Sequence, residues 1–333
     1  MCGKFSGLLL LGALGITACQ DSVAPPEQPA APPMEAKSST SLEAINPALQ
    51  AQIDKLNARL EKGGSKIRLT GGWFFTLGKG VPQFRLLRSG ARWTHNDLHY
   101  IFDAGDLGSE DGLSLADVEN AISAGYNAWS NVSNTSIRAT EIPDFTQTGF
   151  YADNADFLDG TYDNDGNCVS FIDVSSPTLV SISDDGLEIE PPTDIFVGGF
   201  LPEKYFSQCL GSEDIIAVTW TLSGGDVNHD NYEDLVYVEQ FMNTRFRWVT
   251  SGAEFLDDDF FRVDIQSIMT HEDGHSLGLG HYGGPNDNQP LSLHQHDRIF
   301  TPEAVMNPFY VGGEKRDLFN LDQAALRTLY TGH

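Results

Sequence analysis

The first helical pattern of the chain lies between residues 42 and 62. Isoleucine and leucine recur there at intervals of three and four residues, at Ile45, Leu49, Ile53, Leu56 and Leu60. This spacing predicts an amphipathic helix, and Gly63-Gly64 directly after it predicts its end. The helix could pack on the rest of the protein, pair with another chain, or form part of a prosegment.

Capping and periodicity predict two further helices. Ser114 followed three positions later by Asp117 is typical of a helix start. The apolar stripe of that helix consists of Leu115, Val118, Ala121, Ile122, Tyr126 and Trp129. The other helix covers residues 321–330, near the end of the chain.

Runs rich in β-branched and aromatic residues predict strands. The clearest are residues 98–102, 215–222 and 235–238. After the helix that begins at Ser114, residues 131–137 are expected to turn into another strand. Strand, long helix and strand therefore follow one another from about residue 93 onward.

A helical pattern also leads into the most informative stretch of the chain. Ile265, Ile268 and Met269 are spaced for one helix face, and the sequence continues as His271-Glu272-Asp273-Gly274-His275. Side chains four residues apart project from the same face of a helix. The imidazoles of His271 and His275 can therefore reach one point.

A third histidine, His281, can reach that point only if the helix ends first. Six residues beyond His275, a continuing helix would place it on another face. Gly278 and Gly280 lie between them, and glycine adopts the left-handed conformation that ends helices and reverses the chain. We expect the chain to turn there and to bring His281 back.

This arrangement predicts a catalytic zinc site. Three neutral imidazoles, about 2.0–2.1 Å from a tetrahedral Zn²⁺, leave one position open for water. Glu272, next to a ligand but not needed as one, can act as general base. The alternative is an ordinary helix and turn, but the chain has only 9 histidines, and three at set positions beside a glutamate are unlikely by chance. Asp273 adds a second carboxylate, which could face solvent or raise the pKa of Glu272.

The N-terminus has the composition of an export signal. A basic residue, a short apolar run and small residues fill positions 1–18, and Cys19 follows. Residues 16–19 resemble a bacterial lipobox, which implies acylation of Cys19; an ordinary signal peptide is the alternative. Residues 19–41 are rich in proline and alanine and predict an extended linker. We expect an exported protein, either a lipoprotein of the bacterial cell envelope (outer membrane or cell surface) or a secreted one.

The net charge excludes two classes of partner, and the cysteine content allows one disulfide in the folded part of the chain. A formal net charge of −27 argues against nucleic acid and anionic membrane faces, so the lipid anchor would be the only membrane contact. Cys168 and Cys209 could form a disulfide worth about 3–4 kcal/mol, or remain separate thiols.

Further metal sites are conceivable. Ca²⁺ could bind the acidic loop with Asp153, Asp156, Asp159, Asp163 and Asp165, although a solvated loop is the simpler interpretation. Residues 226–234 begin like a calcium-binding EF-hand loop but lack its sixth-position glycine. His294 and His296 could bind a second metal ion, but scattered surface histidines are commoner.

The motif at residues 271–281 and the turn at Met306 resemble the metzincin metallopeptidases. The form M-x-P-x-Y, with Pro308 and Tyr310, resembles the matrixin branch, where these residues form a wall of the substrate pocket. The resemblance implies that Met306 lies beneath the zinc ligands; a plain core methionine is the alternative.

The resemblance covers about residues 93–333. It implies an α+β fold with a twisted mixed β-sheet, long helices, and a methionine turn in a small lower lobe. Residues 42–92 would be a helix and connecting segment outside this domain. A strand bordering the cleft should pair with an extended substrate, and residues 215–221 are the candidate. The cysteine usual in the prosegment of the family is missing, since no cysteine lies between Cys19 and Cys168.

These features predict a zinc-dependent endopeptidase that acts on protein or peptide substrates. Two other functions stay open: a noncatalytic zinc-binding surface lipoprotein, and a zinc hydrolase of a non-peptide amide or ester.

Overall fold

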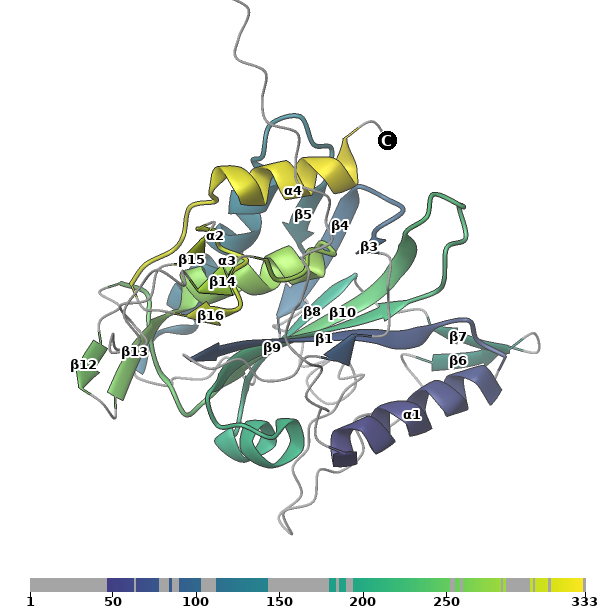
Figure 1. The fold of residues 1–333 in the computed structure, drawn as a ribbon, viewed down its shortest axis with the longest axis horizontal. Helices are drawn as coiled ribbons and strands as arrows, with labels where there is room; N and C mark the ends of the chain where they lie inside the picture. Colours follow the sequence, from purple (N-terminus) through teal and green to yellow (C-terminus); the bar gives the residue numbers. More distant parts are fainter. Residues whose placement is uncertain are drawn as a thin grey trace, which may run out of the picture.

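The structure is a computed structural model of the 333-residue chain. It describes residues 47–62, 64–77, 84–85, 90–102, 112–142, 180–183, 186–189, 194–251, 255–257, 260–282, 284–285, 300–301, 303–310 and 313–331. Together these residues form a mixed α+β fold, as the sequence predicts (Figure 1).

A mixed sheet is the core of this fold. Its main path runs β5 (Arg138–Glu141), β4 (Asp97–Phe102), β8 (Ile195–Leu201), β10 (Glu233–Asn243), β9 (Ile215–Ser223), β1 (Arg68–Leu77) and β16 (Phe309–Tyr310). Strands β5, β4, β8 and β10 are mutually parallel, β9 is antiparallel to both β10 and β1, and β16 is parallel to β1. Two short strands, β2 (Phe84–Arg85) and β3 (Ala91–Arg92), pair with β1 and β10. The order places β1 and β16 at one edge.

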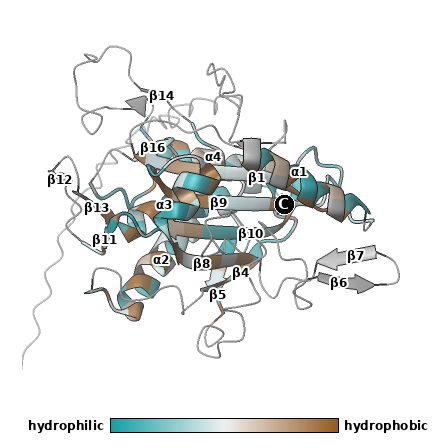
Figure 2. Ribbon diagram, turned by 90° about the horizontal axis from the view of Figure 1, so that it is seen from below, coloured by the Kyte–Doolittle hydropathy of each residue, from teal (hydrophilic) through white to brown (hydrophobic). Residues whose placement is uncertain are grey.

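Helices cover both faces of the sheet. On one side lie α2 (Leu115–Ser130), α3 (Ile265–Ser276) and α4 (Asn320–Tyr330); on the other lie α1 (Pro47–Lys62) and the π-helical turn Tyr205–Leu210 (Figure 1). The ribbon of α1 changes between hydrophilic and hydrophobic colours along its length, as expected for a helix with one face on a sheet (Figure 2).

Small antiparallel and parallel pairs complete the described structure. Strand β13 (Phe260–Asp264) pairs with β11 (Arg247–Val249) and β12 (Phe255–Asp257) and runs directly into α3. The other pairs are β6 (Val180–Ser183) with β7 (Gly186–Ile189), and β14 (Gly284–Pro285) with β15 (Phe300–Thr301).

Successive side chains of β1 point to opposite faces of the sheet and pack in two separate hydrophobic cores. Phe75 packs in the core beneath α2 and α3, with residues such as Trp129 and Met306. Phe74, the next side chain along the strand, packs on the opposite face with Trp220 and the apolar stripe of α1. Strand β1 therefore contributes side chains to both cores.

Several predicted elements are confirmed. The helix at residues 42–62 is described from Pro47 as α1, and the strands at 98–102, 215–222 and 235–238 lie within β4, β9 and β10. Ser114 caps α2, and its hydroxyl and the Asp117 carboxylate make the reciprocal bonds of a capping box. The C-terminal helix is α4.

Three expectations need correction. Leu115 is 40% exposed, because it is the first residue of α2 and points away from the core. Residues 131–137 form turns after the helix, and the strand begins only at Arg138. The main sheet includes β1, so it crosses the boundary that the sequence placed at residue 93.

Other expectations fall on residues outside the described ranges. These are the signal at 1–18, Cys19 and the linker at 19–41, the acidic loop at 153–166, Cys168, His294 and His296. Among the described helices, none has the length and apolarity needed to cross a membrane.

Candidate metal centre

The helix that carries the first two histidines is fixed at both ends. At its start, the Asp264 carboxylate accepts a hydrogen bond from the backbone N–H of Ser267 at 2.9 Å and pairs with Arg316, whose Nη2 lies 2.6 Å from Oδ1. At its end, Gly278 has a φ of +86°, and the Leu279 N–H donates to the Gly274 carbonyl at 3.0 Å. The predicted glycine turn is confirmed at Gly278. Gly280 has no positive φ, so a single residue in the left-handed conformation ends the helix and turns the chain.

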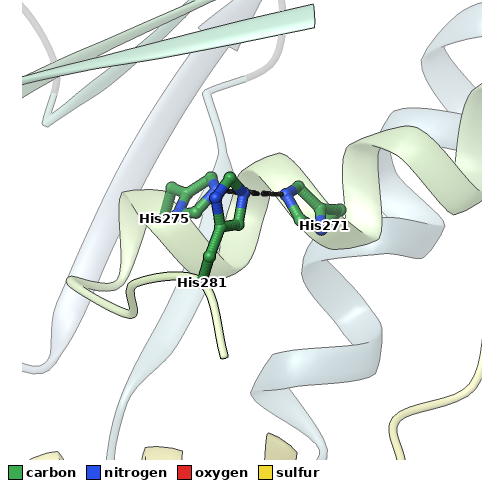
Figure 3. Close-up of side chains that lie close together, drawn as sticks. All are labelled: His271, His275 and His281. Carbon is green, nitrogen blue, oxygen red and sulfur yellow. Dashed lines mark hydrogen bonds between the residues drawn. The ribbon is translucent and has the colours of Figure 1, made fainter. Parts of the chain in front are cut away.

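The turn brings the three histidines together (Figure 3). The Nε2 atoms lie 3.1 Å apart between His271 and His275, 2.9 Å between His271 and His281, and 3.0 Å between His275 and His281. His271 and His275 are fully buried. Among the described residues this is the group of side chains that could hold a metal ion.

Backbone carbonyls fix which nitrogen of two rings carries the proton. His271 Nδ1 lies 2.7 Å from the Val305 carbonyl, and His275 Nδ1 lies 2.7 Å from the Leu279 carbonyl. A carbonyl oxygen can only accept, so each Nδ1 must donate, and each Nε2 presents a lone pair to the other ring. Burial lowers the pKa of His271 to about 3 and lowers the pKa values of His275 and His281 well below the usual range. A proton is therefore disfavoured between the rings.

The residues fit a metal ion such as zinc. Zinc ligand nitrogens at about 2.0–2.1 Å and tetrahedral angles would be about 3.3 Å apart, close to the observed separations. A cation would also relieve the repulsion between the lone pairs that face one another. The carbonyl partners of His271 and His275 are the outer contacts that typically orient metal-binding imidazoles.

Glu272 is completely buried beside this cluster. Its Oε2 accepts a hydrogen bond from the Thr219 hydroxyl on β9 at 2.5 Å, whereas its Oε1 is buried without a hydrogen-bond partner in the described structure. Burial raises the pKa of the carboxyl to about 8, and the bond from Thr219 opposes this rise. One carboxylate oxygen is therefore held by the sheet and the other remains available for a proton.

Asp273 does not face solvent. Its carboxylate is fully buried between α3, α2 and β10, where Gln240 Nε2 lies 3.4 Å from Oδ1. Gly125 of α2 leaves the space for it, because a Cβ there would be 2.5 Å from Asp273 Oδ2. Burial raises the pKa of Asp273, and the charge of Glu272 adds to the rise.

The turn at Met306 lies against the histidine helix. A Cβ added to Gly274, between the two helical histidines, would lie 2.3 Å from Met306 Sδ. The Asp322 carboxylate holds this turn by accepting from the N–H groups of Val305 at 2.9 Å and Met306 at 3.3 Å. Because the Val305 carbonyl binds His271, the turn also orients a candidate ligand.

The two predicted pocket residues lie at the end of the sheet. Pro308 is half-buried and directly precedes β16, and Tyr310 is 3% exposed. The Tyr310 ring meets Phe75 edge-on at 6.0 Å, and its hydroxyl donates to the Gly313 carbonyl at 2.6 Å.

Sequence reasoning missed the aromatic neighbours of the histidines. The Phe75 ring stacks on His271 with centroids 3.7 Å apart, and the Trp73 ring stacks on His275 at 4.9 Å. Both belong to β1, which the sequence placed in a connecting segment. The continuous apolar run Gly71-Gly72-Trp73-Phe74-Phe75 was the available signal, but such a run does not say which strand lies next to it.

Other sequence-predicted sites are less complete. The Asp226 carboxylate accepts bonds from the backbone N–H groups of Asp230 and Asn231, so this loop ties its own backbone together. Calcium binding stays a prediction.

Cys209 is 2% exposed and disulfide-bonded, but Cys168 lies outside the described residues, so the pairing of the two also stays a prediction.

Substitution of Gly278 by alanine should weaken both fold and site. A non-glycine residue is disfavoured at a φ of +86°, and the added Cβ would lie 2.0 Å from the Ala91 carbonyl oxygen. We expect a loss of about 2 kcal/mol or more in unfolding free energy and weaker zinc binding. Gly224→Ala, whose nearest contact would be 3.4 Å, is the control. Equal denaturation midpoints for the two variants would contradict this role of Gly278.

No protein-family model matches the chain. No curated protein matches it either.

Proposed function

We propose that the protein is a zinc-dependent endopeptidase with a metzincin domain of the matrixin type. The observation that carries the proposal is the convergence of three imidazole nitrogens within 3.1 Å of one another beside a buried glutamate with one unpartnered oxygen. A site for zinc storage alone has no need of such a glutamate. The methionine turn that holds His271 in place adds to the support.

The metal ion and the residues of the chain would have different roles in hydrolysis. Bound Zn²⁺ would supply Lewis-acid polarisation of a peptide carbonyl and would acidify a water molecule. His271, His275 and His281 would hold the ion as neutral donors. Glu272 would take a proton on Oε1 and pass it to the departing amine, while the Thr219 hydroxyl keeps Oε2 in place.

Peptide recognition would use the sheet edge and the pocket beside it. An extended peptide can add to a sheet through main-chain hydrogen bonds, which places one of its bonds at a fixed point of the site. Pro308 and Tyr310 would shape the pocket for a substrate side chain. The protein would act outside the cell membrane, attached through a lipid on Cys19 or secreted.

Two other functions predict different outcomes in one assay. The full chain is incubated with an unfolded protein, with small esters and with small amides, before and after removal of metal by a chelator. We expect that only the unfolded protein is cleaved, that the chelator abolishes this cleavage, and that added Zn²⁺ restores it. Hydrolysis of small esters or amides alone would indicate a non-peptide hydrolase, and zinc binding without hydrolysis would indicate a noncatalytic protein.

The hydrogen bond from Thr219 predicts a shift in the pH profile. A general base works only when deprotonated, so kcat should rise with pH through the pKa of Glu272. Burial raises this pKa to about 8 in the metal-free chain and the Thr219 bond lowers it. Thr219→Val should therefore move the acid limb of the profile to higher pH, and Thr328→Val on α4 should leave it in place. An acid limb that does not move would contradict the role of Thr219.

A further inference from the structure

Strand β1 pairs with the edge of β9 that the proposed function needs for a peptide substrate. The sequence made residues 215–221 the strand that pairs with substrate, but β9 has no free edge along this stretch: β10 pairs with one side and β1 with the other. The pairing with β1 is antiparallel and runs from Arg68 opposite Ser223 to Thr76 opposite Ile215. On its other side β1 is parallel to β16, which follows Pro308. A segment of this chain therefore lies where an extended peptide would add.

The side chains of β1 also cover the histidines. Phe75 lies nearly parallel to the His271 ring, at an interplanar angle of 10°, and Trp73 lies at 8° to the His275 ring. Trp73 additionally meets His281 edge-on at 6.0 Å. Every candidate ligand thus contacts an aromatic ring of β1, and the two helical ligands are 0% exposed. The rings of β1 therefore shield the two helical ligands.

Two glycines allow β1 to lie close to β9. A Cβ at Gly72 would be 2.4 Å from the Trp220 ring, and a Cβ at Gly71 would be 2.4 Å from Thr221 Oγ1. Neither glycine has a positive φ, so the requirement is for space and not for backbone conformation.

Helix α1 holds β1 in this position from the opposite face. The Asn57 side chain brackets one residue of the strand: Nδ2 donates to the Leu69 carbonyl at 3.2 Å and Oδ1 accepts from the Leu69 N–H at 2.8 Å. The apolar stripe of α1 packs with Phe74 and Trp220. Helix and strand form one unit whose inner edge reaches the metal centre.

We propose that α1 and β1, residues 47–62 and 68–77, are an intramolecular inhibitor that occupies the edge of β9 to which a peptide substrate would add. This proposal rests on the proposed peptidase function. The strand makes the main-chain hydrogen bonds that a bound peptide would make. Its Trp73 and Phe75 side chains cover the candidate zinc ligands, whereas the related family uses a prosegment cysteine at the zinc. Full activity then requires displacement or removal of β1, and transient displacement of the strand gives the wild-type chain a low basal rate.

The test uses the full chain and three variants loaded with zinc. Gly72→Ala forces β1 away from Trp220 without removing a side chain. Phe75→Ala removes a ring from the histidine side, and Phe200→Ala removes the same ring from β8, where it packs on Trp248 and is separated from β1 by two strands. The rate of zinc transfer to a chelating dye and the rate of cleavage of an unfolded protein are measured for each. We expect Gly72→Ala and Phe75→Ala to raise both rates about tenfold or more, and Phe200→Ala to raise neither to that extent.

The two readouts separate this proposal from the peptidase proposal. Faster zinc transfer in Gly72→Ala and Phe75→Ala, with no hydrolysis by the wild-type chain or any variant, would overturn the peptidase function. It would still support the conclusion that β1 covers the metal centre. Hydrolysis by the wild-type chain, with both rates unchanged in those two variants, would overturn the inhibitor and leave the peptidase in place. Equal acceleration in all three variants would also overturn it, because general destabilisation would then explain the effect.

Discussion

Replacement of Glu272 by glutamine is expected to lower kcat by about 10²–10⁴-fold while the protein keeps its zinc. Glutamine has the same shape, and its amide oxygen can still accept the hydrogen bond that the Thr219 hydroxyl donates. It cannot take up a proton as a carboxylate does. The loss should therefore fall on catalysis and leave metal binding and folding intact. Kinetics on an unfolded protein and the zinc content of the same sample measure the two effects, in the wild-type and the Gly72→Ala background.

Glu213→Gln is the matched control for this substitution. Glu213 is exposed, pairs with Arg245 at 3.3 Å, and lies outside the metal centre. We expect normal turnover from this variant. If Glu272→Gln retained comparable turnover, another group would have to be the general base, and the role assigned to the buried carboxylate would be wrong.

Replacement of His275 by alanine is expected to abolish zinc binding and, with it, hydrolysis. His275 is one of three candidate donors, and its Nδ1 proton is already held by the Leu279 carbonyl. Loss of a direct ligand should weaken zinc binding by more than the roughly 10–100-fold typical of losing an outer hydrogen-bond partner. Dialysed samples of the variant should retain little zinc, and added Zn²⁺ at moderate concentration should not restore activity.

A histidine outside the cluster provides the comparison. His99 on β4 is about half exposed and lies 3.8 Å from Asp194. His99→Ala should keep both its zinc and its activity. Equal zinc content in the His275→Ala and His99→Ala variants would mean that the metal binds elsewhere, and the cluster would then be a set of buried structural histidines.

The local parts of the site could be predicted from the sequence. Helical spacing placed His271 and His275 on one face, and the need for a turn before His281 pointed to the glycines, of which Gly278 has the left-handed conformation. Capping residues predicted the start of α2. These relations join residues a few positions apart, so backbone geometry alone determines them.

The long-range parts could not be predicted in this way. Phe75 contacts His271 from a distant part of the sequence, and Thr219 reaches Glu272 of α3 from strand β9. A continuous apolar run predicts that a strand has two covered faces but not which strand lies beside it. The strand at 215–222 was correctly predicted, whereas its free edge was not, because β1 comes from the segment placed outside the domain.

Crystals of the zinc-loaded full chain, measured on both sides of the zinc absorption edge, test the central claim most directly. We predict one strong anomalous peak about 2.0–2.1 Å from the Nε2 atoms of His271, His275 and His281, with no fourth protein ligand. A peak at other residues, or a fourth side chain that closes the coordination shell, would contradict a catalytic zinc at this site.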